Sequence, residues 1–222
     1  MRFIRLSLIG LAFISSLCMA SPAEPVRGVD YIALKLPQEV KSVPGKVEVI
    51  EFFMYHCPAC NAIEPDIAEW LKKQGSNVEF RRIHLPYSGP KDPEAHLFLT
   101  LEALGLEQSM HAKVLKAWHI DHQRLRTDDD NIEWAIKNGI DKAKFIDAYN
   151  SFSVSASLMR LPKVSENYEV DNTPTFIVNG RYLTNAVMLS ASNPKMNRNE
   201  VTQATFQVID ALVANVLKER AK

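Results

Sequence analysis

The chain has 222 residues, a length that suits one domain with an insertion or two small domains. Its 26 basic and 26 acidic residues give a formal net charge of zero, and this balance does not favour nucleic-acid binding. After residue 20, no apolar stretch is long enough to span a bilayer, so we expect the mature protein to be soluble.

The first 20 residues have the layout of a secretory signal peptide. Arg2 and Arg5 make the start basic, residues 6–17 form an apolar run, and small residues precede a cleavage site after Ala20. Cleavage after Ala23 is an alternative. Because the apolar run is too short to span a membrane, we expect it to be removed during export.

The first part of the mature chain predicts a short strand followed by a β-α-β unit. The short strand is expected over 31–34, and a nearly all-apolar strand, buried on both faces of a sheet, over 47–54. A helix follows over 58–74 and ends at Gly75, before a second strand over 78–85. This order favours a right-handed crossover between two parallel strands.

The pattern is wholly helical from residue 92 to about residue 167. The expected helices cover 92–104, 107–117, 130–137, 141–149 and 153–166. The acidic cluster at 127–130 is interpreted as a helix cap. Trp118 and Trp134 are expected in the core of this helical part.

Strand signals return at 175–178 and 182–184. The two residues between them that carry the turn, Asn179 and Gly180, are a strong hairpin signal. An amphipathic helix is expected over 199–219. The whole chain therefore predicts an α/β fold in the order β, βαβ, helical part, ββα.

The motif Cys57-Pro58-Ala59-Cys60 stands where the buried strand gives way to the helix. The first sulfur then lies at a helix N-terminus, where free backbone N–H groups and the helix dipole stabilise a thiolate. Removal of the signal peptide leaves these as the two cysteines of the mature chain. A chain that used disulfides as structural staples would spread its cysteines over many loops. The pair is therefore interpreted as a site of disulfide exchange.

Two other interpretations of the pair are weaker. A zinc site needs four ligands, and no second Cys-x-x-Cys or suitably spaced histidine pair follows. His119 and His122 are interpreted as part of a solvated polar face. Residues 54–56 could form the apolar rim of a peptide groove, and the sequence leaves this open.

Glu51 is a carboxylate in the middle of the buried strand, so it must be either neutral or paired. One interpretation is a purely structural salt bridge to Arg82 on the adjacent strand. The other is that Glu51 carries a proton to or from the Cys60 thiol during exchange. The two roles do not exclude each other, and both remain open here.

This order of elements, with Cys-x-x-Cys at the strand–helix junction and Thr173-Pro174 before a hairpin, resembles the DsbA family of periplasmic thiol:disulfide oxidoreductases. The resemblance covers most of the mature chain and is most specific over 49–60. It implies a thioredoxin-like α/β fold with an inserted helical domain and no cofactor. The thioredoxin-like domain would comprise 21–90 and 168–222, and the insertion 91–167.

The resemblance also implies roles for particular residues. Cys57 would be the exposed nucleophile and Cys60 its buried resolving partner. Pro174, preceded by Thr173, would be a cis-proline that faces them. Glu51 would be a buried acid below the active site.

Two further positions match the family on the active-site helix, and one position departs from it. Glu64 corresponds to an acid on this helix, and Pro65 to a proline that kinks it. Strongly oxidising relatives carry histidine between the proline and the second cysteine, whereas this chain has Ala59. Alanine offers no donor to the thiolate, and His56 could compensate in part.

We therefore expect a monomeric periplasmic protein that donates its Cys57–Cys60 disulfide to newly exported reduced polypeptides. A DsbB-type inner-membrane partner would reoxidise it. One alternative is a periplasmic reductase or isomerase, although the residues before the first core strand are too few for an isomerase dimerisation domain. The other is a peptide-binding chaperone with an incidental cysteine pair, which would keep its binding after both cysteines were changed to serine.

Overall fold

The computed structural model describes residues 24–221, and the signal peptide expected at 1–20 lies outside them. The strands are β1 (Ile32–Ala33), β2 (Val47–Phe53), β3 (Val78–His84), β4 (Thr175–Val178) and β5 (Tyr182–Asn185). They form one five-stranded sheet in the order β1-β5-β4-β2-β3. Strand β2 pairs parallel with β3, which confirms the β-α-β prediction, and antiparallel with β4.

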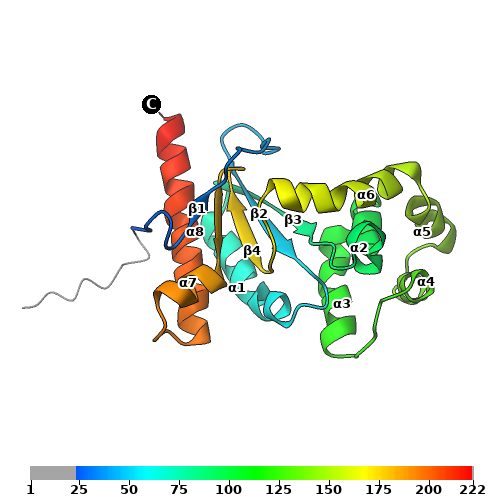
Figure 1. Ribbon diagram of the computed structural model, residues 1–222. Helices are drawn as coiled ribbons and strands as arrows, with labels where there is room; N and C mark the ends of the chain where they lie inside the picture. Colours follow the sequence, from blue (N-terminus) through cyan, green and yellow to red (C-terminus); the bar gives the residue numbers. More distant parts are fainter. Residues whose placement is uncertain (1–23, 222) are drawn as a thin grey trace, which may run out of the picture.

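The helices are α1 (Pro58–Gln74), α2 (Pro93–Ala103), α3 (Glu107–His119), α4 (Asp128–Lys137), α5 (Lys142–Tyr149), α6 (Phe152–Asn167), α7 (Ala186–Ser192) and α8 (Arg198–Arg220), with a short 3-10 helix η1 (Gly89–Lys91) before α2. Helices α1, α7 and α8 lie on one side of the sheet, and α2 to α6, here called the helical block, lie on the other (Figure 1). The expected helices are confirmed to within a few residues. Helix α7 was not expected.

The two faces of β2 enter two separate cores, and all seven of its residues are buried. Val47 and Val49 pack with residues of α1 and α8. Ile50 and Phe52 pack toward the helical block, where the Phe52 ring lies 5.3 Å from that of Tyr168. Burial of each such side chain contributes about 1.5–3 kcal/mol, so β2 is fixed firmly in the middle of the molecule. The end of β2 is therefore a rigid place to mount a reactive group.

Local signals in the sequence explain the ends of several elements. Asn179 and Gly180 both have positive φ, 52° and 62°, as a two-residue hairpin turn requires. A Cβ at Gly180 would collide with the carbonyl oxygen of Gln38, so the close approach of the segment between β1 and β2 requires glycine here. Thr127 and Asp130 form a capping box at the start of α4, which confirms the predicted cap.

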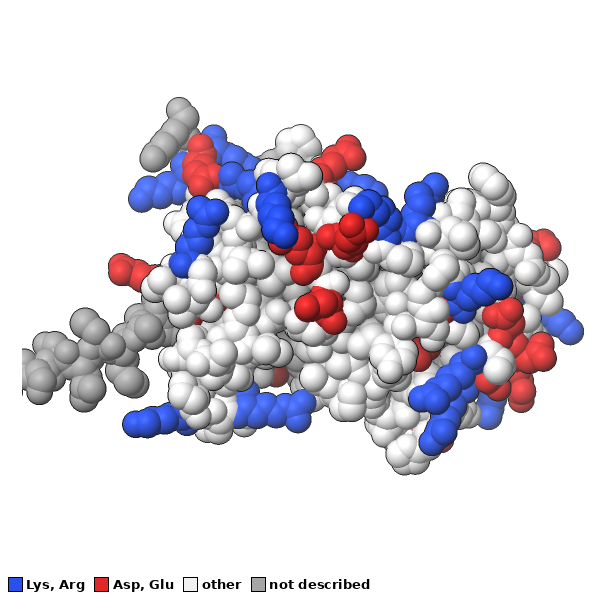
Figure 2. Space-filling view, in the orientation of Figure 1, with Lys and Arg blue, Asp and Glu red and all other residues white. Residues whose placement is uncertain are grey.

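The surface carries charges of both signs. On the face shown in Figure 2, basic and acidic side chains are interspersed, and neither sign dominates. Over residues 24–221, no helix combines the length and the apolar character needed to cross a membrane.

Candidate active site

Cys57 lies between β2 and α1 and caps the N-terminus of the helix. Its φ of −74° and ψ of 115° are those of extended backbone. Pro58 occupies the first helical turn, where an N–H group would have no acceptor within the helix, so proline costs no hydrogen bond. The backbone N–H of Cys60 donates to the Cys57 Sγ, at an N–S distance of 3.4 Å. Both cysteines are free thiols in this structure. The helix therefore directs its N–H groups at the first sulfur, as the motif predicts.

The two thiols differ in accessibility and in acidity. Cys57 is 7% exposed and Cys60 1%, so Cys57 is less open than the resemblance implies, though more open than Cys60. A hydrogen bond from the Cys60 thiol, aided by backbone N–H groups, outweighs burial and lowers the pKa of Cys57 from 9.0 to about 5. Burial, the hydrogen bond with Cys57 and the charge of Glu51 raise the pKa of Cys60 far above its ordinary value. One sulfur is thus a thiolate at neutral pH and the other a thiol.

Thr173 and Pro174 lie opposite the first cysteine, just before β4. The peptide bond between them is cis, as expected. The Cys57 Sγ lies 3.6 Å from the Thr173 carbonyl oxygen, a contact that joins two segments 116 residues apart. The chain thus brings together the ends of two adjacent strands at one sulfur.

Glu51 is fully buried beneath the cysteines and belongs to a charged cluster. Its Oε2 accepts from Arg82 Nε at 3.0 Å, so the salt bridge expected from the sequence is present. Arg82 also contacts Glu64 of α1 at 3.0 Å and Glu107 of α3 at 3.6 Å. Burial, only partly offset by Arg82, raises the pKa of Glu51 to about 8. This carboxyl can therefore hold a proton at neutral pH even though it is paired.

The cluster includes partners from the helical block that sequence reasoning missed. His111 of α3 is buried, and its Nε2 lies 3.0 Å from Glu64 Oε1 and its Nδ1 3.6 Å from Glu107. His111 and Glu107 are four residues apart on one helix, but nothing in the sequence says that this face points at β3. Helix α3 thus supplies charge to the floor of the active site.

Of residues 54–56, for which the sequence left an apolar rim open, Met54 and His56 are half-buried and still reach the surface. Tyr55 is fully buried. The ring of His56 is fixed by Glu94 of α2, whose two carboxylate oxygens lie 2.8 and 3.0 Å from Nδ1. Burial opposes ionisation of Glu94, but the hydrogen bond with His56 and the His84 ring, 3.8 Å away, outweigh it and lower the pKa of Glu94 to about 2. Sequence reasoning missed Glu94.

Two expectations for the helical block need correction. His119 is half-buried and its Nε2 lies 2.8 Å from the Tyr55 carbonyl oxygen, so it is not part of a solvated face, although His122 is exposed. Trp134 is buried as expected, whereas Trp118 is partly exposed and packs beside His56. Among the residues that the structure describes, no three His, Cys, Asp or Glu side chains gather as a metal site would require.

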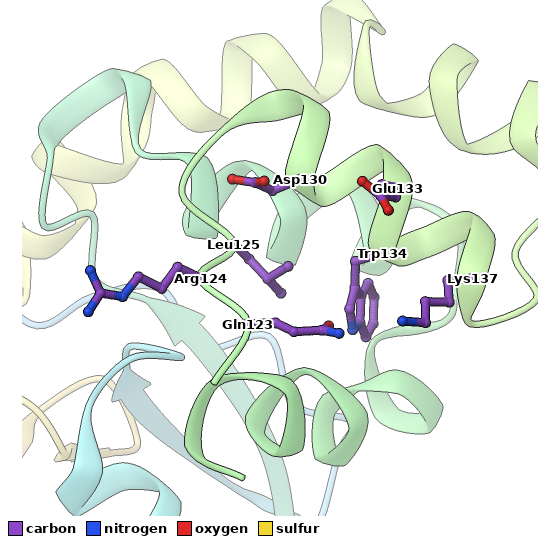
Figure 3. Close-up of a pocket in the computed structure, with 7 residues that line it drawn as sticks. All are labelled: Gln123, Arg124, Leu125, Asp130, Glu133, Trp134 and Lys137. Carbon is purple, nitrogen blue, oxygen red and sulfur yellow. The ribbon is translucent and has the colours of Figure 1, made fainter. Parts of the chain in front are cut away.

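One of the hollows on the surface adjoins the cysteine pair. It has a volume of about 370 Å³, and its lining includes Ala59, Ile63, Pro174, Met196 and Arg198. A second hollow, of about 240 Å³, lies in the helical block, where Gln123 and Lys137 lie beside the Trp134 ring and Arg124 points away (Figure 3). None of the residues that line the second hollow belongs to the cysteine site.

Comparisons with known proteins agree with this geometry. A thioredoxin family model matches residues 44–193. The thiol:disulfide interchange protein DsbA of Burkholderia cepacia is 37% identical over 209 residues, which cover 94% of each chain. DsbA of Pseudomonas aeruginosa is 38% identical over 173 residues, 78% of this chain and 82% of that protein. The crystal structure of P. aeruginosa DsbA superposes with a TM-score of 0.77 at 31% identity, over 89% of this chain and 97% of that chain.

Two neighbouring thiols whose pKa values move in opposite directions can exchange a disulfide with the thiols of another molecule. A pair of this kind on a thioredoxin-like fold defines the class of protein as a dithiol–disulfide oxidoreductase. Within this class, the sequence identity to the DsbA relatives and the share of the chain that it covers identify the family. The chain belongs to the DsbA family of thiol:disulfide interchange proteins.

Proposed function

We propose that this protein acts in the periplasm as a disulfide donor to newly exported polypeptides that arrive with reduced cysteines. The observation that carries the proposal is the lowered pKa of Cys57, about 5. A thiolate this stable favours the reduced form of the protein and leaves readily from a mixed disulfide. Both properties favour transfer of the disulfide to the substrate.

The exchange proceeds in two steps, and Cys57 is attacked in the first and leaves in the second. A substrate thiolate attacks the Cys57 sulfur, the bond to Cys60 breaks, and Cys60 takes up a proton. A second substrate thiolate then attacks the substrate sulfur of the mixed disulfide, and Cys57 leaves as a thiolate. The substrate loses two electrons and two protons, of which one proton stays on Cys60 and the other goes to solvent.

Glu51 is the proposed proton carrier for Cys60. It is fully buried, its pKa is raised to about 8, and its charge is one of the causes that raise the pKa of Cys60. A carboxyl that is protonated at neutral pH can supply the proton when the Cys60 sulfur is released. The hydrogen bond from Arg82 Nε keeps this carboxyl in place while it does so.

The substrate chain is proposed to lie along Thr173 and Pro174 and to pair through its backbone, which tolerates many sequences. The hollow beside Ala59 and Pro174 offers room for one of its side chains. We also propose that a DsbB-type membrane protein reoxidises the cysteine pair, that the protein works as a monomer, and that cleavage after Ala20 releases it into the periplasm. The insertion over 91–167 would then be its helical domain.

The equilibrium between the Cys57–Cys60 pair and glutathione tests the direction of exchange. We expect a couple far more oxidising than glutathione and a rapid, stoichiometric oxidation of a reduced, unfolded substrate. A couple more reducing than glutathione would instead support the reductase or isomerase alternative. A variant with both cysteines changed to serine should lose all exchange, and retention of full substrate protection by that variant would support the chaperone alternative.

A further inference from the structure

His56 directly precedes Cys57 and is fixed by a residue from the helical block. Both carboxylate oxygens of Glu94 lie within 3.0 Å of its Nδ1, and its backbone N–H donates to Glu94 Oε2 at 2.9 Å. The Glu94 side chain is only 9% exposed. One carboxylate therefore holds both the ring and the backbone of the residue beside the reactive cysteine.

Two aromatic rings complete the surroundings of His56. The ring centroid of Tyr87 lies 5.4 Å away in an edge-to-face arrangement, and that of Trp118 of α3 lies 6.0 Å away. The His56 side chain remains 25% exposed. The imidazole is thus held in one position but still reaches solvent, so it can gain and lose a proton.

The charged groups around His56 favour its protonated form. The hydrogen bond with Glu94 of α2, together with the charges of Glu94, of Asp92 at the N-cap of α2 and of Cys57, outweighs burial and raises the pKa of His56. His84 of β3 contacts Glu94 at 3.8 Å from the other side. Tyr87 and the Trp118 ring bring no charge, although the guanidinium of Arg126 lies over the Trp118 ring at 5.6 Å.

The cysteine motif itself contains no charged side chain. Pro58 lacks an N–H group, and Ala59 ends at its methyl group, so within the motif only the Cys60 thiol and backbone N–H groups can donate to a Cys57 thiolate. A positive charge beside Cys57 must therefore come from outside the four-residue motif, and His56 is adjacent to it.

We propose that the His56–Glu94 pair keeps a positive charge beside the Cys57 sulfur and thereby shifts the Cys57–Cys60 couple toward its reduced form. When two electrons break the disulfide, Cys60 takes a proton and the Cys57 sulfur keeps a negative charge, which the imidazolium stabilises. His56 acts here as a positioning residue, because it touches neither the substrate nor the bond that breaks. The inference rests on the proposed roles of the two cysteines.

The test compares the mature protein with its His56→Gln variant, in equilibrium with reduced and oxidised glutathione at pH 7. We expect the equilibrium constant to move toward the oxidised protein by about three- to tenfold, the effect of one charge at a partly exposed site. This corresponds to a potential lower by about 15–30 mV. Thiolate absorbance followed against pH should show a higher pKa for Cys57 in the variant.

Further variants separate the imidazolium from its partner. His56→Gln leaves the Glu94 charge without a counter-ion, so the double variant His56→Gln/Glu94→Gln removes both charges. It should remain less oxidising than the wild type, and His56→Arg should restore at least half of the shift. A double variant indistinguishable from the wild type would overturn the proposal, because the effect would then belong to the uncompensated carboxylate.

His122→Gln serves as the matched control, since it removes an exposed histidine outside the site and should leave the potential unchanged. The outcomes also separate this inference from the proposed function. If the wild-type pair fails to equilibrate with glutathione at all, the proposed roles of the cysteines are wrong. If it equilibrates and His56→Gln shifts neither the potential nor the pKa of Cys57, only the role of His56 is refuted.

Discussion

The reduced protein should gain stability relative to the oxidised protein as the pH rises from about 5 toward 9. The cause is the Cys57 thiol, whose pKa is about 5 in the folded protein against an ordinary value of 9.0. Because the folded-state pKa is lowered, the contribution is complete above pH 9 and is lost as the pH falls through about 5. The oxidised protein has no such thiol and no such contribution.

The magnitude follows from the pKa shift and from the length of the loop. At pH 7 the thiolate contributes about 1–3 kcal/mol to the free energy of unfolding, after allowance for solvent screening. The disulfide closes only a four-residue loop and stabilises the oxidised form by about 2 kcal/mol in the chain-entropy model. The oxidised form should therefore be the more stable one at pH 5, and the reduced form should equal and then exceed it between pH 7 and 8.

Urea unfolding of both forms at several pH values measures this difference. The raised pKa of Glu51 makes both forms less stable as the pH rises, and because burial is its main cause it largely cancels in the comparison. Cys60→Ser should retain the pH dependence of the reduced protein, and Cys57→Ser should abolish it. A difference between the two forms that stays constant from pH 5 to 8 would refute a stabilised Cys57 thiolate.

Three other predictions concern the same site. Brief alkylation of the reduced protein near neutral pH should label Cys57 and spare Cys60, and peptide mass mapping that found Cys60 labelled first would reverse their roles. Ala59→His should add a hydrogen bond to the Cys57 sulfur of about 1–3 kcal/mol and raise the potential by roughly 20–60 mV, and an unchanged potential would mean that the thiolate is already saturated with donors. Glu51→Gln should slow substrate oxidation about 10- to 100-fold below pH 8 in stopped-flow assays, and an unaffected rate would leave Glu51 with only its salt bridge.

Local signals made much of the sheet and of the active-site helix predictable. Pro58 and Gly75 mark the two ends of α1, and the observed helix runs from Pro58 to Gln74 as expected. The apolar run of β2 and the Asn179-Gly180 turn depend on only a few neighbouring residues, so both can be recognised without knowledge of the fold. Helix α7 was missed because it has only seven residues and directly follows a strand, with Asn185 as its cap.

The residues that contact the reactive groups could not all be predicted from the sequence. The Arg82–Glu51 pair was foreseeable because the two residues lie side by side on neighbouring parallel strands. Glu94 and His111 come from helices whose faces are set by tertiary packing, and the sequence pattern of α2 is apolar almost all round. Tyr55 illustrates the same limit, since its burial depends on Phe98 and His111, whose tilted rings lie 6.4 and 5.5 Å from its own.

The position of the helical block has a consequence for protein engineering. Helices α2 and α3 deliver Glu94, Glu107 and His111 to groups that flank or underlie the cysteines. A shortened version that kept only the sheet and helices α1, α7 and α8 would lose Glu107 as a counter-charge to the buried Arg82. It would also lose Glu94, which holds the His56 ring in place. The four-residue motif therefore does not carry its properties with it. Transferred into a thioredoxin fold without the helical block, it would keep the two sulfurs but lose the charged residues that α2 and α3 place around them.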